Sequence, residues 1–553
     1  MNKANNDSKN AIQPTSKSRS FLYAAPTLDP TTCYQAICTK NAQYDGHFFV
    51  GISSTGIYCR PICRVKTPKQ EHCHFFLMAA QAEAAGFRPC MRCRPELAPA
   101  DRHWSTEDAG AILACQAAAL LDRPYWSARP RASGIESMAD VAQKLGISDR
   151  HLRRVFERHW GITPLQYRQT QRLLRAKHLL VDSQLPMAQV ATLSGFSSLR
   201  RFNDSFQAHY QLSPSRLREH GVRQAGPAMD GTVRVRLDYR PPLDLKALMG
   251  FLRQRALKGI ETVGEHCLTR TIDMQHPRAL NKRLNGWIQC RFDPVRPQIC
   301  LIFSESLLPG LHPLIKRVRE AFDLDADPHL IHQVLNVDFP DGEGLRVPGA
   351  FDGFELAVRA VLGQQVTVAA GRTFAQRMVD RFGTQLRLIG ERSPCLTVEN
   401  IALDALKLFP KPQAIAQASS DALGALGIVK QRQAALISLA KAVIAGDLRL
   451  EPMPHDEAAI AHTIQVLCKL PGIGEWTAQY VAMRALGHRD ALPAGDVALH
   501  RALGLQGMPK AKQQTMAHAK AWMPWRSYAV IRAWHSLALP TSASSIVQKD
   551  CST

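Results

Sequence analysis

The sequence has no run of about 18 apolar residues, the length that a membrane-spanning helix needs. The segment from Met1 to about Arg19 is rich in Asn, Ser and Lys and lacks the apolar stretch of a secretory signal. These two absences argue against a membrane protein and against a secreted one. We therefore expect a cytoplasmic protein, a compartment in which disulfides are rare.

Acidic residues are few relative to basic ones. The 553 residues include 47 Asp and Glu against 69 Lys and Arg, which gives a formal net charge of +22. Hydrophobic residues still make up 45% of the chain, so the charge belongs to a folded protein and not to a basic tail. Nucleic acid is the first partner to consider, and the alternative is that the charge only keeps the protein soluble.

The length and the changes in composition predict several domains, each with its own core. We expect a disordered leader, a cysteine-rich domain, a helical domain, a mixed α/β subdomain, an all-α core and a loose tail, at residues 1–30, 31–122, 135–220, 232–327, 328–538 and 540–553. The fold class is therefore multidomain and predominantly α with α+β parts. A loop rich in Pro, Arg and Ser, Arg123–Ser133, is predicted to be a linker.

Periodicity predicts the main elements. Asp108–Asp122 is Ala-rich and favours a helix, whereas Val233–Leu237 and Gln298–Phe303 have the pattern of strands. Nearly everything from Pro328 to Leu537 has the pattern of amphipathic helix. The polar segment Glu219–Gly231 is expected to separate the two halves of the chain.

Seven of the fourteen cysteines lie within the first 93 residues. Cys59-x3-Cys63 and Cys90-x2-Cys93 form two short-spaced pairs, the arrangement that closes a tetrahedral zinc site. The alternative is a core of four buried thiols, which the cationic, turn-forming Arg-Pro surroundings disfavour. Three nearby cysteines have no comparable pairing and are expected to be spare thiols: Cys33, Cys38 and Cys73.

The stretches Gly56-Ile-Tyr-Cys59-Arg-Pro-Ile-Cys63 and Ala85-Gly-Phe-Arg-Pro-Cys90-Met-Arg-Cys93-Arg-Pro resemble the N-terminal domain of the Ada adaptive-response family. The resemblance covers about residues 33–99. It implies one zinc ion and a methyl-acceptor role for Cys59, whose thiolate removes a methyl group from a DNA phosphotriester. Arg60 and Arg64 are expected to attract the phosphate backbone. The alternative is a purely structural zinc site.

An internal repeat follows. Met138–Ala142 and Met187–Ala191 are similar segments 49 residues apart, and each leads into Gly-Ile-Ser or Gly-Phe-Ser. Each unit has the form helix, glycine-containing turn, helix, which is the helix-turn-helix pattern. Ser148 and Ser197 are expected to cap the second helices.

Helical spacing turns aromatic residues such as Phe156 and Phe202 inward and basic residues outward. The pair of units resembles the AraC-type DNA-binding domain, which places two recognition helices in successive major grooves. The residues expected to contact DNA are Arg150, Arg153, Arg154, Arg200, Arg201 and Asn203. The alternative is that they form an ordinary solvated helix face.

Leu470-Pro-Gly-Ile-Gly-Glu-Trp-Thr-Ala478 places Gly472 and Gly474 in a tight turn between two helices. The second helix begins with free backbone N–H groups, so the turn can bind a DNA phosphate without a side chain. A helical corner without a ligand is the alternative. Asp496 follows 22 residues after Gly474 at another glycine-led helix start. Together they form the signature of the helix-hairpin-helix glycosylases.

The whole segment from about Val233 to Leu537 resembles the AlkA-type 3-methyladenine DNA glycosylase II family. Five stretches carry the resemblance: Tyr239–Leu245, Gly250–Leu252, Gly344–Gly349, Arg359–Gln364 and Pro524–Ala529. The resemblance implies that Asp496 is the catalytic carboxylate and that Gln365, flanked by Gln364, is the wedge that enters the DNA. It also implies a base pocket lined by Phe251, Trp476, Tyr480 and Trp534. For the two tryptophans, core packing is the alternative.

Three family features are missing. Trp476 stands where strand-cutting relatives have a Schiff-base lysine, so we expect a monofunctional enzyme. Only Cys551 follows Asp496, so we expect no iron–sulfur cluster. The Pro-Cys-His-Arg motif of guanine O6 demethylation is absent from the sequence. One departure concerns the wedge, which is often apolar in the family and is Gln365 here.

These features together predict a nucleoid-associated bacterial repair protein. It excises 3-methyladenine, 7-methylguanine and related bases from double-stranded DNA, accepts methyl groups at Cys59 and regulates transcription. RNA polymerase is a further expected partner, and a monomer is the expected state. One alternative is a transcription activator whose glycosylase half has lost catalysis. Another is a zinc-stabilised housekeeping glycosylase without a regulatory role.

Overall fold

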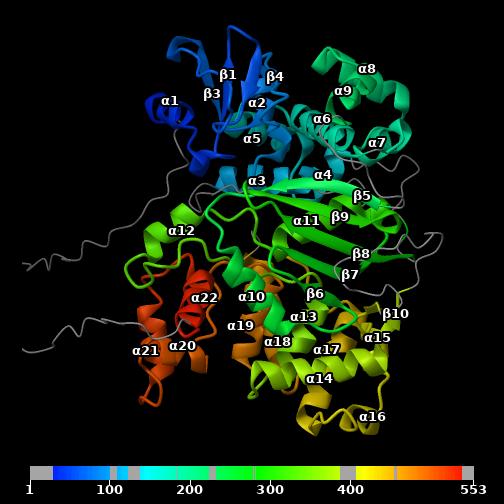
Figure 1. Ribbon diagram of the computed structural model, residues 1–553, viewed down its shortest axis with the longest axis vertical. Coiled ribbons are helices and arrows are strands. Elements are labelled where there is room, and N and C mark those ends of the chain that lie inside the picture. Colours follow the sequence, from blue (N-terminus) through cyan, green and yellow to red (C-terminus); the bar gives the residue numbers. More distant parts are fainter. Residues whose placement is uncertain are drawn as a thin grey trace, which may run out of the picture.

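The computed structural model describes residues 29–99, 109–122, 137–183, 185–222, 232–277, 279, 282–386, 406–453 and 457–538. Figure 1 shows the N-terminal modules at the top, a sheet in the middle and a helical core below. The predicted linker, residues 1–28 and the predicted tail lie outside the described residues. Among the described helices, none combines the length and the apolar character needed to cross a membrane.

The first module, here called the cysteine module, is built on a four-stranded sheet of order β3-β1-β2-β4. Its elements are α1 (Pro30–Thr39), β1 (Phe49–Ile52), β2 (Ile57–Cys59), β3 (Cys73–Phe76), α2 (Ala79–Ala84) and β4 (Arg88–Pro89), with 3-10 turns at Ala42–Tyr44, Gln70–His72 and Pro95–Leu97. β2 ends at Cys59, and β4 ends just before Cys90. Because β2 and β4 are paired and parallel, the two cysteine pairs meet at one end of the sheet.

The tandem helical units confirm the predicted repeat. Their helices are α3 (Ala109–Asp122), α4 (Met138–Lys144), α5 (Asp149–Trp160), α6 (Pro164–Asp182), α7 (Met187–Leu193), α8 (Leu199–Tyr210) and α9 (Pro214–Val222). Ser148 caps α5 as predicted, whereas Ser198 and not Ser197 caps α8. In the predicted polar segment, Glu219–Val222 forms the last turn of α9, and residues 223–231 lie outside the described residues.

The sheet module is a five-stranded antiparallel sheet of order β5-β9-β8-β7-β6. Its elements are β5 (Thr232–Asp238), α10 (Leu245–Arg255), β6 (Glu261–Val263), β7 (Cys267–Gln275), β8 (Arg283–Phe292), β9 (Gln298–Ser304), the 3-10 turn Glu305–Gly310 and α11 (Leu311–Ala321). Val233, Val235 and Leu237 of β5 share a core with α11, so their neighbours Arg234 and Arg236 lie on the other face. Both predicted strands are confirmed.

The helical core confirms the predicted helical character of the second half. Its helices are α12 (Pro328–Leu335), α13 (Gly353–Leu362), α14 (Val368–Phe382), α15 (Pro412–Ala416), α16 (Ser420–Gly424), α17 (Lys430–Ala445), α18 (Glu457–Lys469), α19 (Glu475–Arg484), α20 (Val497–Ala502), α21 (Ala511–His518) and α22 (Arg526–Ser536). One departure is a short antiparallel pair, β10 (Thr384–Gln385) and β11 (Lys407–Leu408). It forms because Leu386, Leu406 and Leu408 pack on Trp287 of the sheet module.

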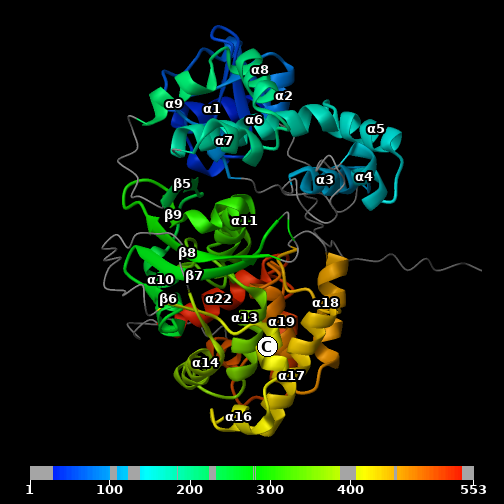
Figure 2. The same ribbon diagram turned by 90° about the vertical axis from the view of Figure 1, so that its right-hand side faces the viewer.

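The described modules are packed against one another. The second helical unit and the sheet module share one apolar cluster, and both views place α7 beside β5 (Figures 1 and 2). The cysteine module contacts the sheet module through buried charges. Arg60 donates to Asp238 at 2.7 Å, and the fully buried Arg240 donates to the backbone oxygen of Asp45 at 2.9 Å.

Candidate functional site

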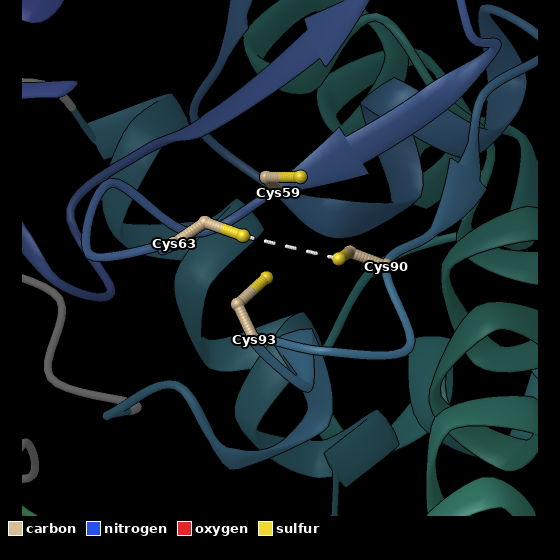
Figure 3. A group of neighbouring side chains, drawn as sticks. All are labelled: Cys59, Cys63, Cys90 and Cys93. Carbon is tan, nitrogen blue, oxygen red and sulfur yellow. Dashed lines mark hydrogen bonds between the residues drawn. The ribbon is translucent and has the colours of Figure 1, made fainter. Parts of the chain in front are cut away.

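The four predicted cysteines form one cluster (Figure 3). The sulfur atoms of Cys59, Cys63, Cys90 and Cys93 all lie within 4.8 Å of one another, and Cys63 and Cys90 are 3.9 Å apart. Sulfur atoms on a regular tetrahedron with Zn–S bonds of about 2.3 Å are about 3.8 Å apart. The geometry therefore fits zinc. Cys33, Cys38 and Cys73 are outside this group.

The surroundings of the cluster suit sulfur ligands. The backbone N–H groups of Arg60 and Arg92 donate to the sulfurs of Cys93 and Cys90 at 3.3 and 3.4 Å. Such N–H donors stabilise thiolates, the form of cysteine that binds metal. Cys59 is only 2% exposed, so the cluster buries the residue that the resemblance assigns as methyl acceptor.

Arg60 does not have the predicted role of a phosphate attractor. Its side chain is 2% exposed and forms buried ion pairs with Asp45 and Asp238, and it also donates to the backbone oxygen of Cys93 at 3.0 Å. The prediction was wrong because two carboxylates bind the Arg60 guanidinium. One of them, Asp238, is 178 residues away in the sequence. Arg64 is exposed and stays a candidate.

A lysine that was not predicted from the sequence forms hydrogen bonds beside the cluster. Lys177 of α6 is fully buried and donates to the backbone oxygen of Cys90 at 2.9 Å and to Glu96 at 2.6 Å. Burial of Glu96 acts to raise its pKa, but Lys177 and Arg94 outweigh burial and lower that pKa to about 2. Helix α6, which lies between the two helical units in the chain, thus contacts one side of the cysteine cluster.

The predicted DNA-contacting residues of the tandem units are all exposed: Arg150, Arg153 and Arg154 on α5 and Arg200, Arg201 and Asn203 on α8. The inward aromatic residues Phe156 and Phe202 are fully buried, as predicted. Arg153 pairs with Asp149 at 2.8 Å, and Arg154 contacts His151 at 3.0 Å. These neighbours orient the guanidinium groups without covering them.

The helical hairpin between α18 and α19 has the predicted geometry. Gly472 has a φ of +75°, which favours glycine, and a Cβ there would lie 3.2 Å from the Ala435 side chain. Gly474 is the N-cap of α19, where no side chain caps the helix, and a Cβ at this position would meet nothing within 4 Å. The backbone at the start of α19 therefore has open space beside it.

Asp496 lies at the start of α20 with its carboxylate fixed by three N–H donors. The backbone of Leu499 and the indole of Trp534 donate to Oδ1 at 2.7 and 2.9 Å, and the indole of Trp476 donates to Oδ2 at 2.8 Å. The residue is 8% exposed. Charge-assisted hydrogen bonds of this kind hold a carboxylate in one orientation. The site can stabilise a positive charge that develops beside it.

The predicted pocket aromatics come together around Asp496. The rings of Trp476 and Tyr480 stack at 5.3 Å between centroids, and Trp534 lies 6.2 Å from Tyr480. The two tryptophans are partly exposed, and their N–H groups point to the carboxylate instead of into the core. The resemblance predicted that both tryptophans line a base pocket, but not that their indoles donate to Asp496.

Two arginines in this pocket were also missed. The guanidinium of Arg255 lies 3.7 Å from the ring centroid of Phe251, and that of Arg484 lies 4.8 Å from it. Arg484 donates to the Tyr480 hydroxyl at 2.6 Å. Burial would raise the pKa of Tyr480, but Arg484 and Arg255 outweigh burial and lower that pKa below its ordinary value. A spacing of four residues, Phe251 to Arg255 and Tyr480 to Arg484, was the available signal.

The two glutamines at the predicted wedge have different surroundings. Gln364 donates to the backbone oxygen of Gly472 and to the Thr477 hydroxyl, both at 2.9 Å, so it braces the hairpin. Gln365 is exposed and has a φ of +54°, which is uncommon for a residue other than glycine. An exposed, strained residue beside the hairpin suits a side chain that enters DNA.

Comparison with known families covers most of the chain. Four family profiles match: the metal binding domain of Ada at residues 32–96, a helix-turn-helix domain at 141–220, the AlkA N-terminal domain at 234–352, and the HhH-GPD superfamily base excision DNA repair protein at 358–527. The first two matches fall on the cysteine module and the tandem helical units, the third covers the sheet module and α12, and the fourth covers most of the rest of the helical core.

Three curated relatives match the chain over different lengths, and the first of them matches nearly all of it. A Mycobacterium tuberculosis protein named "Probable bifunctional transcriptional activator/DNA repair enzyme AlkA" is 32% identical over 92% of this chain and 97% of its own length. DNA-3-methyladenine glycosylase 2 of Escherichia coli is 32% identical over 54% of this chain and 96% of its own length. The bifunctional transcriptional activator/DNA repair enzyme AdaA of Bacillus subtilis is 31% identical over 34% of this chain and 81% of its own.

Proposed function

The chain belongs to the family of the bifunctional transcriptional activator/DNA repair enzyme AlkA, and on this basis we propose that its second half is a monofunctional DNA glycosylase for alkylated bases. The observation that carries the proposal is the Asp496 carboxylate, fixed by three N–H donors beside Tyr480 and close in sequence to the hairpin. Substrates are 3-methyladenine, 7-methylguanine and related bases. DNA is the partner that the helix-turn-helix and helix-hairpin-helix modules support.

The reaction follows from these groups. A base alkylated at a ring nitrogen carries positive charge and leaves readily once it is flipped from the duplex. As the N-glycosidic bond breaks, the sugar gains positive charge, which the Asp496 carboxylate stabilises while water supplies the new C1′ oxygen. Trp476 has no amine, so no Schiff base forms and the product is an intact abasic site.

Asp496→Asn tests the proposal. The charge is lost while the shape is nearly kept, so single-turnover excision of 3-methyladenine should fall about 10²–10³-fold, or about 3–4 kcal/mol. Excision of a neutral base such as hypoxanthine should fall further, because that base is a poorer leaving group. In the wild type, three N–H donors bind the two carboxylate oxygens of Asp496, whereas asparagine has only one acceptor oxygen. Thermal denaturation and DNA affinity must therefore be measured together with the rates. Near-normal excision would mean that Asp496 only caps α20.

For the N-terminal half we propose one zinc ion bound by Cys59, Cys63, Cys90 and Cys93. Zinc would keep the four sulfurs deprotonated at neutral pH. The Cys59 sulfur attacks the methyl carbon of a phosphotriester, the carbon–oxygen bond breaks, and the phosphate leaves as a diester anion. Methylation turns the Cys59 thiolate into a thioether, which cannot form a thiolate again. Each chain therefore reacts once. Retention of full zinc stoichiometry by a Cys63→Ala, Cys93→Ala double variant would contradict the ligand set.

Methylation at Cys59 also provides a signal. The cluster loses one negative charge, so the protein should bind its promoter more tightly and regulate transcription with RNA polymerase. In this proposal the chain acts as a cytoplasmic, nucleoid-associated monomer. Promoter affinity measured at several salt concentrations should rise on methylation and stay unchanged in Cys59→Ser exposed to the same methylated DNA. A chain that releases no methylated base but still activates its promoter would favour the alternative, an activator that has lost catalysis.

A further inference from the structure

The outer face of the sheet module carries a cavity that none of the proposed activities uses. The cavity has a volume of 360 Å³ and contains four guanidinium groups. Arg234 and Arg236 come from β5, Arg291 from β8, and Arg296 from the turn between β8 and β9. We call this surface the arginine cavity.

Strand register explains why these side chains gather. Arg236 on β5 and Arg291 on β8 are both the cross-strand partners of Cys300, so they flank one small side chain on β9, the strand between them. Among the described residues that line the cavity, Asp293 is the one acid, and its Oδ1 already accepts from the backbone N–H groups of Val295 and Arg296 at 2.9 and 3.0 Å. The described lining therefore contains four arginines and one aspartate, which suits an anion.

The helical core covers another part of this sheet face. Trp287 of β8 lies on the same face as Arg291 and packs against Leu386, Leu406 and Leu408 of the helical core. Among the described residues, those of the helical core that pack on Trp287 do not line the arginine cavity. Its edge strand is the first element after the tandem helical units, and His178 of α6 contacts the backbone oxygen of Arg236 at 3.1 Å.

We propose that the arginine cavity binds the phosphate backbone of duplex DNA that the tandem helical units hold. All four cations are arginines, whose planar forks match phosphate oxygens in a way that lysine does not. The second helical unit is fixed to the sheet module by a shared apolar core, so DNA on that unit lies at a set position relative to the cavity. The contact carries no sequence information. It extends the DNA-binding surface from the helix-turn-helix units toward the glycosylase half.

The test uses the full-length, zinc-loaded protein. Arg291→Ala with Arg296→Ala removes the two exposed cations of the cavity, and Lys441→Ala with Arg449→Ala removes two exposed cations from the helical core as the matched control. The probe is a long, lesion-free duplex, and its affinity is measured over a range of KCl concentrations. The slope of log affinity against log salt should fall by about one to two in the cavity variant, because each phosphate that is no longer neutralised lowers the slope by about 0.9. The control should keep the wild-type slope.

Arg296→Glu extends the test to a single position and should lower the affinity further than the alanine change at that position. An unchanged slope in the cavity variants, or an equal fall in the control, would overturn the proposal. Loss of affinity for polyglutamate with DNA affinity unchanged would also overturn it, since the cavity would then bind an acidic protein. Excision from a short lesion duplex should stay normal in the cavity variant, which separates this proposal from that for Asp496.

Discussion

The Asp496 carboxylate caps α20 and also accepts hydrogen bonds from two indoles. The sequence predicted the acid, since a glycine-led helix start 22 residues after the hairpin is a local pattern. It did not predict that Trp476 and Trp534, 20 and 38 residues away, donate to it. Indole direction depends on tertiary packing, and no local pattern encodes it.

The pocket arginines lead to a prediction about substrate preference. Arg255 lies against the Phe251 ring. A cationic base that stacks on the predicted pocket rings would therefore be repelled by the positive charge of Arg255. Unit charges about 10 Å apart interact by about 1–2 kcal/mol at an effective dielectric of 20. Arg255→Met should therefore raise the excision rate of 7-methylguanine relative to hypoxanthine roughly tenfold, as measured in single-turnover assays.

Arg253→Met is the matched control on the same helix. Arg253 is exposed and donates to the backbone oxygens of Val263 and Gly264, away from Phe251. Its loss should leave the ratio of the two rates unchanged. The same ratio in both variants would show that the charge of Arg255 does not reach the flipped base.

At the scale of elements, helices and strands were predicted correctly where the sequence signal is local. The cap of α5 was predicted at Ser148, but the cap of α8 was placed one residue early, at Ser197 instead of Ser198. Two adjacent serines offer the same cap, and packing of Phe202 and Phe206 in the core decides between them. β10 and β11 were missed because each has two residues and depends on contacts with Trp287.

The hairpin before α19 gives a prediction at this scale. Gly474 has an extended backbone, and a methyl group there would meet no protein atom within 4 Å. Gly474→Ala should therefore leave thermal stability nearly unchanged, while the methyl group blocks the approach of a phosphate and weakens binding to lesion DNA. Wild-type affinity with wild-type stability would show that the hairpin does not bind the backbone.

At the scale of the whole molecule, four family modules could be predicted from sequence, but not how they pack. Arg60, next to Cys59, was predicted to face DNA, yet it is buried against Asp238 of the sheet module. His47 of the cysteine module also contacts Asp327, the N-cap of α12, at 2.6 Å. Contacts between residues 178 and 280 positions apart depend on tertiary structure alone.

The last prediction concerns this interface. Asp238→Asn removes one of two carboxylates from the buried Arg60, which keeps Asp45. Loss of a whole partner from a buried pair costs about 3–5 kcal/mol, so with one partner left we expect about 1–3 kcal/mol. The cysteine module should then melt separately from the sheet module in calorimetry, and chelation of zinc should no longer lower the melting temperature of the glycosylase half. Asp273→Asn is the control, because Asp273 pairs with the exposed Arg283 on the same sheet and should leave one cooperative transition. Separate transitions in the wild type would contradict the coupling, since Arg60 would then join two modules that already unfold independently.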